Sequence, residues 1–249
     1  MAYSGGVRKP LQCQWVCAVF ALLLASCCLL ITVVSPGWAA SPRPATAKLT
    51  VYLKTDASQA ARPMDSMRRE LARLMQTAGY ELEWRGPQDS NVDTGAFLAV
   101  VELKGDCEAP SGSFGPGSTL PNMAQLASTS VSDGQVLPFS WVNCGNVTKL
   151  LAPALLDLPA ARADFIFGRA VARLIAHEFY HMLMQTREHT RSGISKPCFT
   201  AADLLTNSFE FEYAALAQLQ RSQAGHTVEL PPAASSAADA SEPVSGRSR

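Results

Sequence analysis

The chain has 249 residues, enough to bury one hydrophobic core, and 47% of them are hydrophobic whereas only 17% are charged. The 21 basic and 21 acidic residues cancel to a formal net charge of zero, so the sequence lacks the basic excess that is typical of nucleic-acid-binding domains. This composition excludes nucleic acid as the expected partner and favours a globular domain with an additional apolar segment.

The apolar segment lies near the start of the chain. Residues 15–34, WVCAVFALLLASCCLLITVV, contain no charge and follow the basic residues Arg8 and Lys9. Such a run is long for the core of a cleavable signal peptide and just long enough to span a bilayer. We therefore expect residues 1–40 to be a signal peptide or an N-terminal membrane anchor. The sequence LASC within it also resembles a bacterial lipobox, which would place a lipid on Cys27.

All three interpretations of this segment predict export, because the basic residues that precede it stay on the cytoplasmic side. The protein is therefore expected in the cell envelope, periplasmic or extracellular. It would be held at the membrane by residues 15–34 if the segment is not cleaved.

Export bears on the three cysteines that follow the segment, because an oxidising compartment permits one disulfide bond among them. Cys107 and Cys144 each follow an apolar, strand-like run, which favours a bond between these two and leaves Cys198 free. The alternative is three buried free thiols.

The next segments have the patterns of strands and a helix. Residues 48–54 and 80–84 carry apolar side chains at every second position, as half-buried strands do, and residues 96–103 form the continuous apolar run of a central strand. Residues 63–79 carry methionine, leucine and alanine at helical spacing and end with Gly79, which favours a helix stop. The methionines of this stripe are expected in the core.

A β-hairpin is predicted near residues 126–142. The dipeptide Asp133-Gly134 suits a tight type I′ turn and separates two runs of strand-like composition. Pro138 lies in the second run and cannot donate a ladder hydrogen bond, so this strand is predicted to lie at an edge of the sheet.

A long helix is predicted from about residue 160 to residue 185. Its apolar residues lie nearly all round the helix, which is typical of a buried helix. A polar loop leads from it to Thr200, whose spacing to Asp203 resembles a capping box that opens one last helix ending near residue 222.

These elements define the expected domain organisation. Strands, a backing helix, a hairpin, a buried helix and a last helix predict an α+β layer sandwich over residues 45–223. Residues 224–249 are rich in Pro, Ala and Ser and are predicted to form a disordered tail.

The buried helix carries the sequence HEFYH at residues 177–181. Residues four apart project from one side of a helix, so His177 and His181 can present two imidazoles to one zinc ion. Glu178 is rotated by about 100° from His177, so it cannot be an equivalent ligand, but it can act as general base on a water that zinc acidifies. The alternative, core histidines satisfied by hydrogen bonds, is disfavoured because three buried ionisable groups are costly without a metal or partners.

The motif HEFYH and the order of elements before it resemble the zincin metallopeptidases. Residues 48–185 follow the order of the family's catalytic domain, in which an antiparallel edge strand borders the cleft. The resemblance implies a zincin-like α+β fold with a mixed sheet, a backing helix and a buried motif helix. It also implies zinc-dependent hydrolysis of a peptide or protein substrate bound along an edge strand near residues 126–142. The stretch HEFYHMLMQTREH is similar to exported bacterial proteins that carry this extended motif.

The sequence departs from the known zincin subgroups at the third zinc ligand. Metzincins place a glycine and a third histidine three and six residues after the second histidine, where this chain has Met184 and Arg187. No methionine follows Met184, which excludes a metzincin-type Met-turn. Gluzincins take a glutamate from a later helix, where Glu210 and Glu212 are the candidates.

We expect His189 to be the third ligand. It lies in the polar loop after the helix, and no glycine intervenes between His181 and Gly193 to stop the helix early. The helix is therefore expected to run a turn further than in metzincins, which would bring in His189 two residues later than their third histidine.

Two other functional interpretations are open at this point. Residues 92–96, VDTGA, resemble the Asp-Thr-Gly loop of aspartic peptidases, but the chain has one copy and its helices do not suit that all-β fold. The alternative from a different class is a non-catalytic envelope protein that keeps the zincin fold as a binding module. Metal content and peptide cleavage distinguish this alternative from the peptidase.

Overall fold

The computed structural model describes residues 46–55, 59–86, 89, 97–111 and 124–226. The predicted N-terminal segment with Cys27 and the Asp-Thr-Gly stretch at 92–96 lie outside the described residues. The tail was predicted from residue 224, but residues 224–226 still belong to the last helix. The rest of the predicted tail, after His226, also lies outside the described residues. Among the described helices, none combines the length and the apolar character needed to cross a membrane.

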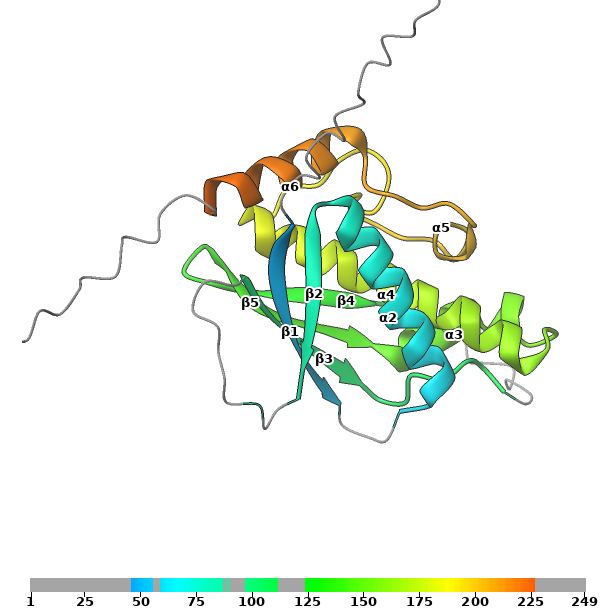
Figure 1. The fold of residues 1–249 in the computed structure, drawn as a ribbon. Helices are drawn as coiled ribbons and strands as arrows, with labels where there is room; N and C mark the ends of the chain where they lie inside the picture. The colour runs from blue at the N-terminus through cyan, green and yellow to red at the C-terminus, as the bar shows by residue number, and fades with distance from the viewer. Residues whose placement is uncertain (1–45, 56–58, 87–88, 90–96, 112–123, 227–249) are drawn as a thin grey trace, which may run out of the picture. The chain divides into compact units, whose positions relative to one another are not determined.

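A five-stranded mixed sheet with the order β2-β1-β3-β5-β4 forms the centre of the described domain (Figure 1). The strands are β1 (Ala47–Thr55), β2 (Tyr80–Arg85), β3 (Phe97–Lys104), β4 (Ala127–Ser132) and β5 (Gln135–Asn143). The pairs β1–β2, β1–β3 and β3–β5 are parallel, and β4 pairs antiparallel with β5 at the edge. The predicted α+β class and the mixed sheet with an antiparallel edge strand are confirmed.

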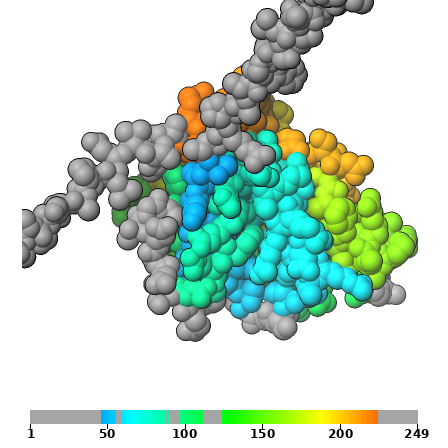
Figure 2. Space-filling model, in the orientation of Figure 1, coloured from blue at the N-terminus to red at the C-terminus, as the bar shows by residue number. Residues whose placement is uncertain are grey.

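Helix α2 (Ala61–Thr77) connects the parallel strands β1 and β2 and packs on α4 (Ala160–Met184). Its buried residues recur at helical spacing and include Met64, Met67, Leu71, Leu74 and Met75. The helix ends before Gly79, whose φ of 89° is left-handed, a conformation that glycine adopts without steric cost. In Figure 2 the cyan surface of α2 lies between the blue and teal of β1 and β2 and the yellow-green of α3 and α4.

Helix α4 is buried over most of its length, as its apolar pattern predicted. It contacts α2 on one side and strands β3, β4 and β5 on another. The close approach to α2 occurs at Gly168, where an added Cβ would lie 2.2 Å from the carbonyl oxygen of Pro63 and 2.7 Å from the Cβ of Ser66. Position 168 must therefore be glycine for the two helices to meet at this distance.

Replacing Gly168 by Ala is expected to lower the free energy of unfolding by about 1–3 kcal/mol, the usual cost of overpacking a core. The clash involves backbone atoms of α2, which cannot move aside as a flexible side chain can, so it outweighs the roughly 1 kcal/mol that alanine gains over glycine in a helix. Urea unfolding monitored by circular dichroism measures the change.

The control for this variant is Gly145→Ala in helix α3 (Cys144–Leu155), where the nearest atom to an added Cβ is 3.5 Å away. This variant should unfold at the wild-type urea concentration or slightly above it. Equal unfolding midpoints for Gly168→Ala and the wild type would contradict the packing argument.

A disulfide bond joins Cys107 to Cys144, the pair favoured by the sequence, and Cys198 is free and exposed. Strands β3 and β5 are parallel neighbours whose ends are in register, with Lys104 opposite Asn143. The two cysteines follow these residues, and their Cα atoms are 4.9 Å apart, within the usual range for a disulfide.

The prediction that the strand with Pro138 lies at the edge is wrong, because β5 lies between β3 and β4. A register shift explains how proline is accommodated there. Thr129 of β4 pairs with Ser140, but Val131 pairs with Val136, so β5 bulges between these pairs. The pairing with β3 begins only at Phe139. Pro138 therefore lies where neither ladder needs its missing N–H.

Two helical features differ from the sequence-based expectation. Helix α3 was not predicted; Asn143, whose side chain accepts a hydrogen bond from the backbone N–H of Asn146, caps its start. The predicted capping box of Thr200 and Asp203 is present, but it opens the short α5 (Ala201–Leu205), and a separate helix α6 (Tyr213–His226) follows. The prediction of a single last helix was therefore wrong.

The break after α5 has a physical reason. The buried guanidinium of Arg173 donates to the backbone carbonyl of Leu204 over 2.7 Å and to that of Asp203 over 3.3 Å. Side-chain donors thus satisfy carbonyls at the helix end that a longer helix would have used for itself.

Candidate metal centre

His177 and His181 lie on successive turns of α4 and are both buried. The Nδ1 atom of His177 is 2.7 Å from the carbonyl oxygen of Ile194, and that of His181 is 2.8 Å from the carbonyl oxygen of Thr186. A carbonyl oxygen only accepts, so both Nδ1 atoms carry the proton and donate it. The Nε2 atoms of the neutral imidazoles therefore carry lone pairs.

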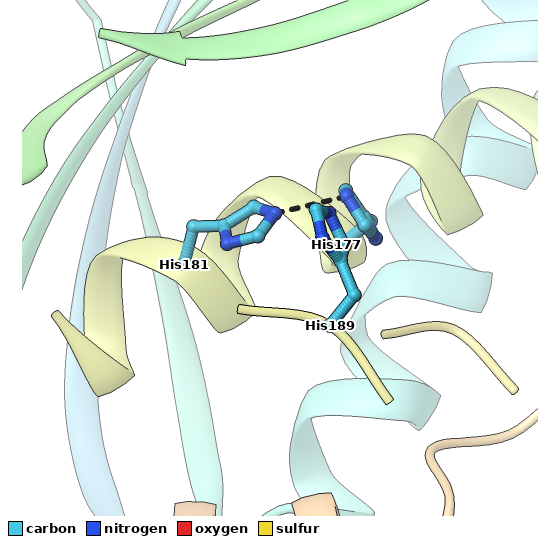
Figure 3. Close-up of side chains that lie close together, drawn as sticks. All are labelled: His177, His181 and His189. Atoms are coloured by element: carbon cyan, nitrogen blue, oxygen red, sulfur yellow. Dashed lines mark hydrogen bonds between the residues drawn. The ribbon is translucent and has the colours of Figure 1, made fainter. Parts of the chain in front are cut away.

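These two Nε2 atoms lie 3.0 Å apart (Figure 3). Two lone pairs at this distance repel each other unless a proton or a cation lies between them. Two imidazoles that bind one tetrahedral zinc ion at about 2.0–2.1 Å have ligand atoms roughly 3.3 Å apart. The spacing of His177 and His181 thus fits a shared metal ion.

His189 completes the group, as the sequence predicted. Its ring stacks on that of His177 with centroids 5.3 Å apart and meets that of His181 edge-on at 4.8 Å. The ligand atoms of His177, His181 and His189 lie within 4.8 Å of one another, so the three residues could hold a metal ion. Figure 3 shows His177 and His181 on the helix and His189 on the segment that passes beside it.

The environment keeps these histidines in the form that binds metal. Burial lowers the pKa of His177 to about 4, although its hydrogen bond to Ile194 opposes the shift. Burial also lowers the pKa of His181 and of the more exposed His189. All three are therefore neutral at pH 7, and a metal ion does not have to displace protons from them.

The loop after α4 supplies most of the remaining site. Helix α4 ends at Met184 with Gln185 in the left-handed conformation, at φ 48°, so the predicted extension by a further turn is wrong. The chain turns back instead, and residues 186–194 provide His189 as well as the carbonyls of Thr186 and Ile194. One loop thus orients both helical histidines and brings in the third.

The two glutamates that were alternative candidates for the third ligand, Glu210 and Glu212, form hydrogen bonds with other residues. The carboxylate of Glu210 accepts a hydrogen bond from Arg73 of α2 over 2.6 Å. That of Glu212 accepts hydrogen bonds from the backbone N–H and the hydroxyl of Ser192. Neither belongs to the group of described residues that could hold a metal ion.

Gly193 permits the contact between the loop and this segment. It forms a β-bridge with Phe211, and the N–H of Ile194 donates to the carbonyl of Glu210 over 3.0 Å. An added Cβ at Gly193 would lie 2.4 Å from that carbonyl oxygen, and the residue has φ 70°. Glycine is therefore required here for both its conformation and its size.

Glu178, the predicted general base, is buried next to His177 on the same helix. Its Oε2 atom accepts a hydrogen bond from the hydroxyl of Thr129 on β4 over 2.6 Å. Burial raises the pKa of Glu178 to about 7, and the hydrogen bonds with Thr129 offset part of this effect. A carboxylate with this pKa can both accept and release a proton near neutral pH.

A cleft of about 970 Å³ contains the three histidines and Glu178. Residues 124–129, which lead into and include the first half of edge strand β4, line one wall. Apolar side chains line another part of the cleft: Val131, Val136, Leu150, Leu174 and Phe199. The group that could hold a metal is therefore accessible to a ligand that lies beside β4.

Sequence reasoning missed the residues that support this group. The residues around Thr129 have an ordinary strand pattern that does not mark it as functional. The contact made by a backbone carbonyl, such as that of Ile194, does not depend on the residue type and so could not be predicted from the sequence. The side chain of His226, which the sequence places after the domain, is outside the described part. The comparisons with known proteins add no further constraint: no protein-family model matches the chain, and no curated protein matches it.

Proposed function

We propose that the chain is a zinc-dependent metallopeptidase of the zincin type, in which His177, His181 and His189 hold the metal and Glu178 is the general base. The observation that carries the proposal is that Glu178 and the three histidines line one cleft, which is bordered by an antiparallel edge strand. Burial raises the pKa of the Glu178 carboxyl to about 7, and groups with such shifts are common at functional sites.

The donor set supports zinc as the metal. Catalytic zinc ions are often held by three neutral imidazoles, and such ligands commonly donate their other ring N–H to a carbonyl, as the Nδ1 atoms of His177 and His181 do here. Zinc bound there would act as a Lewis acid and lower the pKa of a coordinated water. The residues fit this ion, since three protein ligands leave one position open.

The chain's own residues account for the proton transfers. Glu178 takes a proton from the attacking water and returns it to the nitrogen of the leaving amine. Such a transfer suits hydrolysis of the amide bond, whose leaving group must be protonated.

The proposed substrate is a peptide or protein segment bound along β4 in an extended conformation. Strand β4 forms the edge of the described sheet and borders the cleft, so its outer backbone groups are placed to pair with an added strand. Export to the cell envelope is part of the proposal and is supported by the Cys107–Cys144 bond, since disulfide bonds persist in oxidising compartments.

Metal analysis and peptide cleavage by the purified full chain test this proposal. We expect about one zinc ion per chain, cleavage of peptides from a mixed library, loss of cleavage with a chelator, and its return with added zinc. The double variant His177→Ala/His181→Ala should bind no zinc.

Two results would contradict the proposal in different ways. A chain that stays metal-free after zinc is supplied would exclude the zinc enzyme. A chain that binds zinc but cleaves no peptide would favour the non-catalytic binding module.

A further inference from the structure

A hydrogen bond joins the edge strand to the motif helix across 49 residues of sequence. The hydroxyl of Thr129 lies 2.6 Å from Oε2 of Glu178 and 3.3 Å from the backbone oxygen of the same residue. The shorter contact falls in the range of charge-assisted hydrogen bonds between a hydroxyl and a carboxylate. Thr129 is thus bonded to Glu178 and is not merely close to it.

This hydrogen bond makes the two carboxylate oxygens of Glu178 inequivalent. A hydroxyl has one proton to donate, and here it goes to Oε2. The backbone of Thr129 also contributes a hydrogen bond that stabilises the Glu178 carboxylate, so one residue holds this carboxylate through two groups. The hydroxyl of Thr129 therefore fixes the position of Oε2.

The irregular pairing of β4 and β5 determines where Thr129 points. Thr129 is the last residue of β4 in regular register before the shift, and it lies opposite Ser140. Opposed residues of neighbouring strands share a face of the sheet, and Ser140 is buried, so this face is the one covered by α4. A change of register by one residue would turn the hydroxyl away from Glu178.

We infer that Thr129 is a positioning residue for Glu178: its hydroxyl holds Oε2 and thereby orients the carboxylate for the proton transfer. The inference rests on the proposed function, because it assigns Thr129 a part in the same reaction. It adds a second role to β4, which would both pair with the substrate backbone and orient the general base.

The test compares Thr129→Val with Thr129→Ser. Valine keeps the shape of threonine but cannot donate, whereas serine keeps the hydroxyl. We expect Thr129→Val to lower kcat by roughly 10–100-fold, the usual effect at a metal site of removing a hydrogen bond that orients a functional side chain, with KM unchanged. Thr129→Ser should retain most of the wild-type kcat, and zinc content should be the same in both variants.

Ser140→Ala serves as the matched control. It removes the hydroxyl opposite Thr129, which has no hydrogen-bond partner among the described residues and does not line the cleft. This variant should keep the wild-type kcat. Its result shows whether the effect of Thr129→Val is specific to the hydroxyl that contacts Glu178.

A spectroscopic measurement tests the hydrogen bond without catalysis. In the metal-free chain, the infrared difference between wild type and Glu178→Gln identifies the carboxylate band of Glu178. This band should shift in Thr129→Val and stay in place in Thr129→Ser. The visible spectrum of the cobalt-loaded chain should not change in either variant, since Thr129 is not a metal ligand.

The outcomes separate this inference from the proposed function. An active wild type with full kcat in Thr129→Val, or with Thr129→Ser as impaired as Thr129→Val, would overturn the positioning role alone. An unshifted infrared band in Thr129→Val would also overturn it. A wild-type chain without peptidase activity would overturn the proposed function, and the role of Thr129 with it.

Discussion

Glu178→Gln is expected to keep a full complement of zinc and to lose peptide hydrolysis by about 10²–10⁴-fold, the range that general acid–base catalysis contributes. The amide has nearly the shape of the carboxylate and can still accept the hydrogen bond from Thr129 through its oxygen. It cannot take up a proton, so the transfer from water to the leaving amine fails. Steady-state kinetics on one peptide substrate, with zinc measured in the same samples, provides both readouts.

The metal measurement decides which role of Glu178 is correct. Full zinc content with lost turnover agrees with a general base that lies beside the metal. Loss of zinc in Glu178→Gln would mean that the carboxylate is a ligand, and the assignment of His177, His181 and His189 as the complete set would then be wrong.

His189→Ala is expected to weaken zinc binding by more than the roughly 10–100-fold that loss of a ligand's hydrogen-bond partner costs, because it removes one of the three proposed ligands. Activity should fall with the metal content and recover in part at high zinc concentration. Zinc affinity measured by competition with a coloured chelator checks the expectation.

The matched controls are the two glutamates that the sequence left as rivals. Glu210→Gln removes the charge that pairs with Arg73 and should leave zinc affinity unchanged. Glu212→Gln weakens the contact with Ser192 and should lower zinc affinity by at most roughly 10–100-fold, because it acts only through the loop that carries His189. If His189→Ala retains zinc and either glutamate variant loses it, the site is gluzincin-like.

The parts of the fold that follow a simple period could be predicted from the sequence. The alternation in residues 48–54, the helical stripe in 63–79 and the all-round apolar pattern of the motif helix correspond to β1, α2 and α4. The Asp133-Gly134 turn was also predictable. Both residues have positive φ, at 50° and 79°, as a type I′ turn requires.

Features that depend on tertiary contacts could not be predicted in this way. Helix α3 contains Gly145 and Pro153, which weaken its helical signal, and it is stabilised by its cap and by the burial of Val147 and Leu151. Pro138 correctly predicted a position without a ladder hydrogen bond. The sequence did not show that a bulge provides such a position within a central strand. In both cases the contacts of the folded domain override the local preference.

In the candidate metal centre, too, local features could be predicted from the sequence and features that depend on tertiary contacts could not. The spacing of His177, Glu178 and His181 within one helix is a local property, so their convergence followed from the sequence. His189 was expected as well, but by an extension of α4 that does not occur; the left-handed Gln185 turns the chain back instead. The position of Thr129 next to Glu178 depends on the pairing of two strands and could not be predicted from the sequence.

The edge position of β4 has a consequence for the behaviour of the protein in concentrated solution. An open sheet edge can pair with the same edge of another copy, and such self-association leads to aggregation. Strand β4 is short, its sequence ASTSVS is mostly polar, and its ladder is interrupted after Thr129. Short length, polarity and bulges are the features that discourage pairing between copies. The strand can therefore stay open to the extended peptide that we propose as substrate while resisting the growth of a continuous intermolecular sheet.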